Sequence, residues 1–235
     1  MEFPTRLRSV DQSTTTIAGS EHTPPFTVNS LLGTDPAREK LEQYIAGVFH
    51  AAYGATVLEY LPLLFSLEQG GATHAALGLR SARHEPLFCE QYLDAPLERH
   101  VQKEFGRTVN RGQLMELGNL AGSIPGQSVV LYLMVVAALE QAGISHLVFA
   151  ANRTVRLSIR RFGFPTRELG DANPDCLGER ASQWGSYYRG CPKVMLADVR
   201  RGVEYGNSHP LIGELWRSEQ ALIAALADSI RCQRF

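Results

Sequence analysis

The sequence has few cysteines, and none of them lies close to another. No two of the four cysteines form a C-x-x-C pair, so their spacing supports neither a zinc site nor a disulfide framework. The seven histidines are equally scattered, and none lies three or four residues from another histidine or from a cysteine, as a helical metal site requires. We therefore predict no metal site.

Long apolar runs and an excess of charge of one sign are also missing. The longest apolar stretch, 128–139, is too short to span a bilayer and is expected to form a buried helix. The first residues, MEFPTRLRSVDQSTTT, lack the apolar segment of a secretory signal, which indicates a cytoplasmic location. A net charge of -1 argues against nucleic acid as a partner.

What is present fits one folded domain that follows an N-terminal arm. The chain has 235 residues, which is enough for a single domain with a well-buried core. Residues 1–30 are rich in Ser, Thr and Pro and lack sustained periodicity, so we expect a flexible arm there. The domain is then expected to cover 31–235.

Hydrophobic periodicity in the first half predicts a helix, a hairpin and a short second helix. The first helix is expected to start at 34–36, followed by an antiparallel hairpin of 56–67 and 73–80 around a Gly-Gly turn. Pro62 favours an edge or a bulge for the first strand of that hairpin. Residues 87–93 are expected to extend the second strand or form a third, and 96–105 to form a helix.

The second half predicts a β-α-β-α unit and a helical end. Strand 113–120, helix 127–141, strand 146–151 and helix 153–161 imply parallel pairing of the two strands with a right-handed crossover. A loop after Arg167, a short helix at 181–188, a strand at 193–199 and one long helix at 210–230 follow. The pattern indicates an α/β fold whose mixed sheet carries helices on both faces.

Two features of strand 113–120 suggest chemistry. Glycines follow it before a helix, so backbone N–H groups at that helix start could receive an anion or oxyanion, unless this is a plain strand-helix loop. The spacing matches neither the P-loop nor the Rossmann motif. Glu116 either points into a cleft, where a raised pKa would let it accept a proton from an amine, or lies on an exposed strand face.

Several segments carry a resemblance to known families. NRTVRLSIRRFGF, residues 152–164, resembles the segment of GNAT acyltransferases in which Asn152, Gly163 and Phe164 fall at the family spacing. FCEQYLDAPLE, ELGNLAG and WGSYY, which begin at residues 88, 116 and 184, resemble the thermostable hemolysin family. The EQYLD segment is also similar to the acyl-homoserine-lactone and N-acyl amino acid synthases, a branch of GNAT-like enzymes.

The resemblance implies a GNAT-like, mostly antiparallel sheet and an N-acyltransferase. The acyl group would come from an acyl-CoA or acyl-carrier-protein thioester, a co-substrate and not a permanently bound cofactor, and pass to the amine of an amino acid or other small molecule. A carrier protein and a second copy of the chain are the expected macromolecular partners. The tyrosine that many GNAT enzymes carry after the fifth strand is Ile159 here, and the loop AGSIPGQS at 121–128 contains no cation.

The same resemblance assigns candidate site residues. It implies Glu116 as the base, Asn119 beside the oxyanion, and Tyr187 and Tyr188 as proton donors. For the thioester it implies Leu117, Gly118, Gly122, Gly126, Gln127 and Asn152, and for the acceptor Gln91, Trp184 and Arg153. The aromatic residues could instead only pack, and the arginines at 153, 156 and 160 could form a solvated face.

Two other functions compete with acyl transfer. One is a protein of the same fold that binds a ligand without catalysis. The other is a membrane-active hemolysin, which requires an exposed amphipathic surface. Residues 211–230 mix acidic and basic side chains and show no basic face, which argues against the second.

Overall fold

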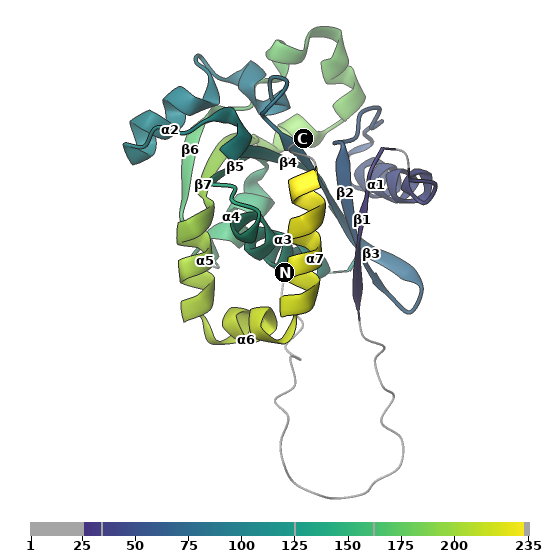
Figure 1. The fold of residues 1–235 in the computed structure, drawn as a ribbon. Coiled ribbons are helices and arrows are strands. Elements are labelled where there is room, and N and C mark those ends of the chain that lie inside the picture. Colours follow the sequence, from purple (N-terminus) through teal and green to yellow (C-terminus); the bar gives the residue numbers. More distant parts are fainter. Residues whose placement is uncertain (1–25, 34, 125, 162, 233–235) are drawn as a thin grey trace, which may run out of the picture.

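The computed structural model describes residues 26–232 except 34, 125 and 162, and their strands form one sheet of seven strands in the order β1-β2-β3-β4-β5-β7-β6 (Figure 1). The strands are β1 Thr27–Leu31, β2 Leu63–Gln69, β3 Ala72–Ser81, β4 Leu114–Gly122, β5 His146–Ala151, β6 Thr166–Asp171 and β7 Lys193–Asp198. The α-helices are α1 Arg38–Tyr53, α2 Leu97–Phe105, α3 Gln127–Gln141, α4 Arg153–Arg161, α5 Val199–Ser208, α6 Pro210–Ser218 and α7 Gln220–Cys232. Short 3₁₀ helices are η1 Phe88–Tyr92, η2 Arg111–Gln113, η3 Pro174–Trp184 and η4 Tyr187–Gly190.

The sheet is mostly antiparallel and splits at its one parallel pair, β4 with β5. That pairing joins Leu114–Glu116 to His146–Val148 and goes no further, although both strands continue. The other strand pairs in the sheet are antiparallel. The fold class and the parallel pairing predicted from the sequence are therefore confirmed, and the sheet has an opening beyond Glu116.

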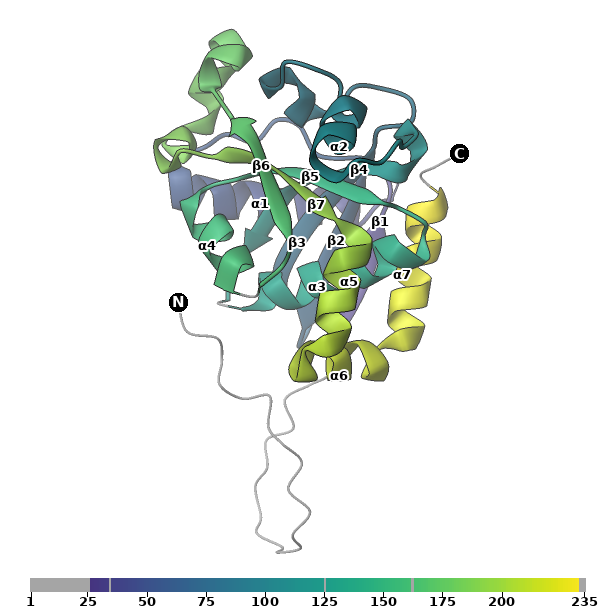
Figure 2. The same ribbon diagram turned by 90° about the vertical axis from the view of Figure 1, so that its left-hand side faces the viewer.

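Helices cover both faces of the sheet (Figures 1 and 2). On one face α3 packs against α5 and α7 over the largest core cluster, which includes Phe65, Leu77, Leu117 and Phe149. On the other face α1 covers β2 to β4 around Leu64, while η1 and α2 cover β5 and β7. Alternate residues of each strand therefore contribute to the cores on opposite faces of the sheet, because successive side chains of a strand point to opposite sides.

The predicted β-α-β-α unit has the bounds that the sequence pattern indicated for α3, β5 and α4. The first of these helices follows Gly126, its N-cap, whose φ of 89° suits glycine, and ends before Gly143, which has a φ of 75°. Glycine positions and apolar periodicity were therefore sufficient to predict the bounds of these three elements. The hairpin of β2 and β3 is confirmed as antiparallel.

Other predictions were wrong where tertiary contacts outweigh local preference. Residues 56–62 are not strand, 87–93 contain η1 in place of a strand, and 166–171 form β6 where a loop was expected. The short helix predicted at 181–188 is divided between η3 and η4. The long terminal helix is divided into α6 and α7 at Glu219, whose φ of -109° and ψ of 25° end α6, although Trp216 of α6 and Ile223 and Ile230 of α7 are buried in the same core cluster.

The N-terminal arm predicted for residues 1–30 extends too far, because its last residues belong to the sheet. Residues 27–31 form β1, the edge strand that pairs antiparallel with β2, and Val28 is buried beneath α7. The sheet accordingly begins inside the region predicted as flexible, since a five-residue strand is too short to show periodicity. The rest of the predicted arm, 1–25, lies outside the described residues.

A bulge interrupts β4 in the middle of its length. Gly78 of β3 lies opposite Gly118, whereas Ala76 lies opposite Ala121, so two residues of β4 are accommodated against one of β3. Asn119, one of the two, has a φ of 50°, a conformation that asparagine tolerates better than most residues. The bulge therefore marks the place where β4 changes the face to which its side chains point.

Candidate functional site

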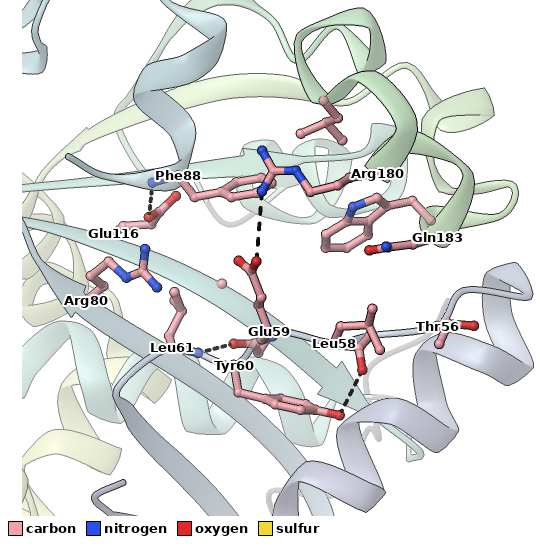
Figure 3. Close-up of a pocket in the computed structure, with 15 residues that line it drawn as sticks. Thr56, Leu58, Glu59, Tyr60, Leu61, Arg80, Phe88, Glu116, Arg180 and Gln183 are labelled. Atoms are coloured by element: carbon pink, nitrogen blue, oxygen red, sulfur yellow. Dashed lines mark hydrogen bonds and ion pairs between the residues drawn. The ribbon is translucent and has the colours of Figure 1, made fainter. Parts of the chain in front are cut away.

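A small pocket with several charged side chains in its wall lies beside β4 and is framed by five separate parts of the chain (Figure 3). Its volume is about 100 Å³. It is lined by Thr56–Leu61, by Arg80 and Phe88, by Glu116, Gly118 and Asn119 of β4, and by Leu177, Arg180, Gln183 and Trp184 of η3. We call this the polar pocket.

The segment 56–61 that forms the floor of the polar pocket is held by hydrogen bonds from distant residues. The Thr56 N–H donates to the Gln183 carbonyl at 2.6 Å, and the Leu61 N–H donates to the Asn119 side-chain oxygen at 2.8 Å. The Arg38 guanidinium donates to the Leu61 and Pro62 carbonyls, each at 2.8 Å. These contacts replace a sheet ladder, which explains why β propensity was misleading here.

Glu116 lies at the inner wall of the polar pocket, where it is only 3% exposed. Its two carboxylate oxygens accept the backbone N–H groups of Phe88 and Cys89, each at 2.8 Å, and so anchor the start of η1. Burial raises the pKa of Glu116, against the opposing effect of hydrogen bonds from Cys89 and Phe88 and of the Arg80 charge. A carboxylate in this state is suited to take up a proton.

Two arginines give the polar pocket a cationic side. Arg80 lies directly across the ladder from Glu116, and its Nε is buried without a hydrogen bond, 3.6 Å from the Glu85 carboxylate. Arg180 of η3 faces Glu59 at 3.8 Å, with both side chains more than half exposed (Figure 3). The pocket therefore presents cations and carboxylates to the same small volume, an arrangement that fits a zwitterionic ligand.

A larger, mainly apolar cavity of about 410 Å³ passes through the split in the sheet. It is lined by Val48, Phe49, Ala52 and Tyr53 of α1, by Leu117 and 120–124 of β4 and the loop after it, by Phe149 of β5, by Gly126, Ser128, Val129 and Tyr132 at the start of α3, by Thr154, Val155, Ser158 and Ile159 of α4, and by Phe164. Since α1 and α3 lie on opposite faces of the sheet, the cavity connects the two faces where β4 and β5 part. We call this the apolar cavity.

The two pockets meet along one stretch of β4. Glu116 and Gly118 face the polar pocket, while Leu117 and Leu120 face the apolar cavity. In the described ladders Asn119 and Leu120 have no Cα partner in β3 or β5. These two residues therefore lie outside both strand registers, at the point where β4 and β5 part.

Of the residues predicted for a thioester, most line one of the two pockets. Leu117, Gly122 and Gly126 line the apolar cavity, whereas Gly118 lines the polar pocket on the other side of the strand. Gln127 is the first residue of α3 and lines neither of these two pockets. Ile159, the position that lacks the expected tyrosine, is part of the cavity wall.

The predicted proton donors lie behind the pockets. The Tyr187 hydroxyl donates to the Ala150 carbonyl at 3.4 Å, and the Tyr188 hydroxyl shares a 2.6 Å hydrogen bond with Tyr92. Burial raises the pKa of both hydroxyls. Neither residue lines the polar pocket or the apolar cavity, so the structure gives no support to them as proton donors and favours the packing alternative.

The residues predicted to bind the acceptor are only partly brought together. Trp184 lines the polar pocket, whereas Gln91 donates to the Phe88 carbonyl and faces neither pocket. Arg153 lies on an exposed, open depression of α4 that it shares with Arg156 and Arg160. Asn152 caps α4 through the Val155 N–H and reaches the apolar cavity only through Tyr53.

Sequence reasoning missed several lining residues, namely Tyr53, Glu59, Arg80 and Arg180. Tyr53 precedes Gly54, which ends α1 with a φ of 64°, and a helix-ending glycine is a signal that could have placed it. The two arginines carry no motif. Within the described part of the chain, His, Cys, Asp and Glu form no group of three or more that could hold a metal, and no helix has the length and hydropathy needed to cross a membrane.

Comparison with known proteins places this geometry in context. The thermostable hemolysin family model matches residues 32–203. The fold is similar to FeeM, an N-acyl amino acid synthase from uncultured soil microbes, with a TM-score of 0.56 and 14% identity over 82% of this chain and 98% of that chain. It is also similar to the AHL synthase LasI, with a TM-score of 0.51 and 11% identity over 75% of this chain and 91% of that one. Among curated proteins the sequence has no match.

Proposed function

We propose that this chain, which belongs to the thermostable hemolysin family, transfers an acyl group from a thioester to the amine of an amino acid or similar small molecule. The observation that carries the proposal is the meeting of a polar pocket and an apolar cavity across β4, at the point where β5 separates from it. Such a split lets a thioester lie in the sheet while an amine approaches from the other side of the strand.

The polar pocket suits the acceptor. A carboxylate of the acceptor would face Arg80 or Arg180, and its amine would lie toward Glu116. Glu116, directly or through water, would take the proton that the nitrogen loses as it attacks the carbonyl carbon.

The apolar cavity suits the donor. Its lining is dominated by aliphatic and aromatic side chains and includes Gly122 of β4 and Gly126 before α3, where a thin pantetheine-like arm could pass. The carbonyl oxygen would meet the backbone of Asn119 and Leu120 at the bulge. The donor would be acyl-CoA or an acyl-carrier protein, and it would leave as free thiol.

The test is thiol release by the purified chain with acyl-CoA and acyl-carrier-protein donors, with and without a mixture of amino acids. We expect release that depends on the amine, and a product whose mass is that of the free carboxylic acid plus the amino acid minus one water. Donor binding without release would favour the non-catalytic alternative. Leakage of lipid vesicles by the protein alone, with neither binding nor release, would favour the membrane-active one.

A further inference from the structure

Tyr53, the last residue of α1, is held rigidly in the wall of the apolar cavity. Its carbonyl accepts the Ser186 N–H at 2.8 Å and the Ser186 hydroxyl at 3.2 Å. A Cβ at Gly185 would come 2.1 Å from that carbonyl oxygen, so this approach of η3 to α1 requires glycine. The Tyr53 ring packs edge-on against Tyr187, with centroids 5.3 Å apart. Backbone and ring are thus fixed from two sides.

The Tyr53 hydroxyl is oriented by Asn152. The Asn152 side-chain oxygen accepts the Val155 N–H at 3.0 Å as the cap of α4, which fixes which end of the amide faces the tyrosine. The remaining NH₂ group lies 2.8 Å from the Tyr53 oxygen and can only donate to it. The tyrosine oxygen therefore accepts this hydrogen bond, and its own proton is left to donate elsewhere.

Tyr132 is the other tyrosine that lines the cavity, and it does not combine these properties. Ile159 has no polar side-chain atom, and burial raises the pKa of Tyr132, whose hydroxyl receives no hydrogen bond from another described residue. A phenolate at Tyr132 would be left without a donor, whereas one at Tyr53 would keep the hydrogen bond from Asn152. Of these two tyrosines, Tyr53 is therefore the one whose oxygen already accepts a hydrogen bond that would remain after proton transfer.

We propose, resting on the acyl transfer described above, that Tyr53 is a catalytic residue that protonates the departing thiolate and that Asn152 is its positioning residue. As the acceptor nitrogen bonds to the carbonyl carbon, the carbon–sulfur bond breaks and its electron pair goes to sulfur. Sulfur takes the Tyr53 proton, and the phenolate is stabilised by the Asn152 amide. The proton lost by the nitrogen then returns to Tyr53 through Glu116 or solvent, so charge and atoms balance.

The experiment compares Tyr53→Phe with wild type on two donors that carry the same acyl group. One is an alkyl thioester, whose thiolate needs a proton to leave, and the other is an aryl thioester, whose thiolate is stable at neutral pH. General acid catalysis contributes about 10²–10⁴-fold, so Tyr53→Phe should lower kcat at least about 100-fold with the alkyl donor. With the aryl donor we expect a loss of less than about threefold, since no proton is needed there.

Tyr205→Phe on α5 is the matched control, because Tyr205 lines neither pocket. It should behave as wild type with both donors. Equal losses of Tyr53→Phe on the two donors, or no loss at all, would overturn the role of Tyr53 while leaving acyl transfer in place. Wild-type protein that releases no thiol in the presence of any amine would overturn the proposed function itself, and this inference with it.

Discussion

The polar pocket and the apolar cavity share β4 but are built in different ways. The apolar cavity is formed mainly by regular elements, α1, β4, β5, α3 and α4, that apolar periodicity and glycines define. The polar pocket is formed by an irregular segment, a 3₁₀ helix and single charged residues that hydrogen bonds hold in place. One side of the site therefore follows from local pattern and the other from long-range polar contacts.

This difference predicts how each of the two pockets should respond to amino-acid substitution. A cavity between packed helices and strands keeps its shape through many apolar contacts, so a single substitution changes what it can hold before it changes stability. The polar pocket depends on a few buried hydrogen bonds, so losing one partner leaves a buried group unsatisfied. Substitutions on the two sides should thus separate into effects on the donor and effects on the acceptor and on folding.

The largest effect is expected from filling the apolar cavity. Val129, in the first turn of α3, is half-buried and lines the cavity, so Val129→Trp should place an indole where the donor binds. We expect kcat/KM for the thioester to fall at least about 100-fold, which corresponds to about 2.7 kcal/mol. Leu157→Trp, on the exposed side of α4, is the control. Unchanged donor kinetics in Val129→Trp would remove the cavity from the donor site.

Acid should loosen the wall of the polar pocket. Burial alone would raise the pKa of Glu90 in η1, but hydrogen bonds from Arg111 and from the Leu97 and Leu87 N–H groups outweigh it and lower the pKa to about 2. A carboxyl with a depressed folded pKa stabilises the fold above its unfolded value of 4.5, and this contribution is lost as the pH falls from 4.5 toward 2. The full change in pKa corresponds to about 3 kcal/mol, and because Glu90 is only partly buried, solvent screening reduces the expected contribution to about 2 kcal/mol.

Urea unfolding from pH 7 to pH 3 measures this contribution, with Glu90→Gln as the reference that cannot titrate. The stability difference between wild type and Glu90→Gln should shrink across that window. Glu116 has the opposite sign, because its raised pKa means that the folded state binds its proton more tightly. Since both proteins contain Glu116, its contribution cancels in the difference. A constant difference between pH 7 and pH 3 would contradict the assignment.

Asn119 lies at the bulge of β4, and its substitution should have a smaller effect on stability that differs between alanine and glycine. Asn119→Ala removes the acceptor of the Leu61 N–H and the donor to the Glu59 carbonyl, and it keeps a positive φ that alanine disfavours. Asn119→Gly removes the same two hydrogen bonds without that strain. We expect Asn119→Ala to lower the free energy of unfolding by about 2 kcal/mol and Asn119→Gly by about 1 kcal/mol. Thermal unfolding checks the order, and a less stable glycine variant would contradict the strain argument.

The smallest effect is expected at the rim of the polar pocket. Arg180 is exposed and only loosely paired with Glu59, so Arg180→Ala should leave folding unchanged and raise KM for an amino acid acceptor by about three- to tenfold. The KM for the thioester should not move. An acceptor amide that lacks the carboxylate should show no difference between the variant and wild type, and an equal loss with that amide would contradict a carboxylate contact.

The sequence by itself determined the parts of this protein in which each residue's environment follows from its near neighbours. Apolar periodicity with flanking glycines placed α3, β5 and α4, and with them the parallel pair whose splitting opens the sheet. Glu116 and the glycines of the following loop could be singled out because strand, turn and helix succeed one another there. These features are local, so a local pattern is enough to reveal them.

Only the tertiary structure decided which side chains face one another across the site. Residues 56–61 have a β-rich composition, yet contacts from Arg38, Asn119 and Gln183 make them a pocket floor. Tyr53 and Asn152 are 99 residues apart in sequence and meet through one hydrogen bond, whereas Tyr187 and Tyr188 turn away. Such pairings depend on how packed elements bring distant segments together, and no spacing along the chain encodes them.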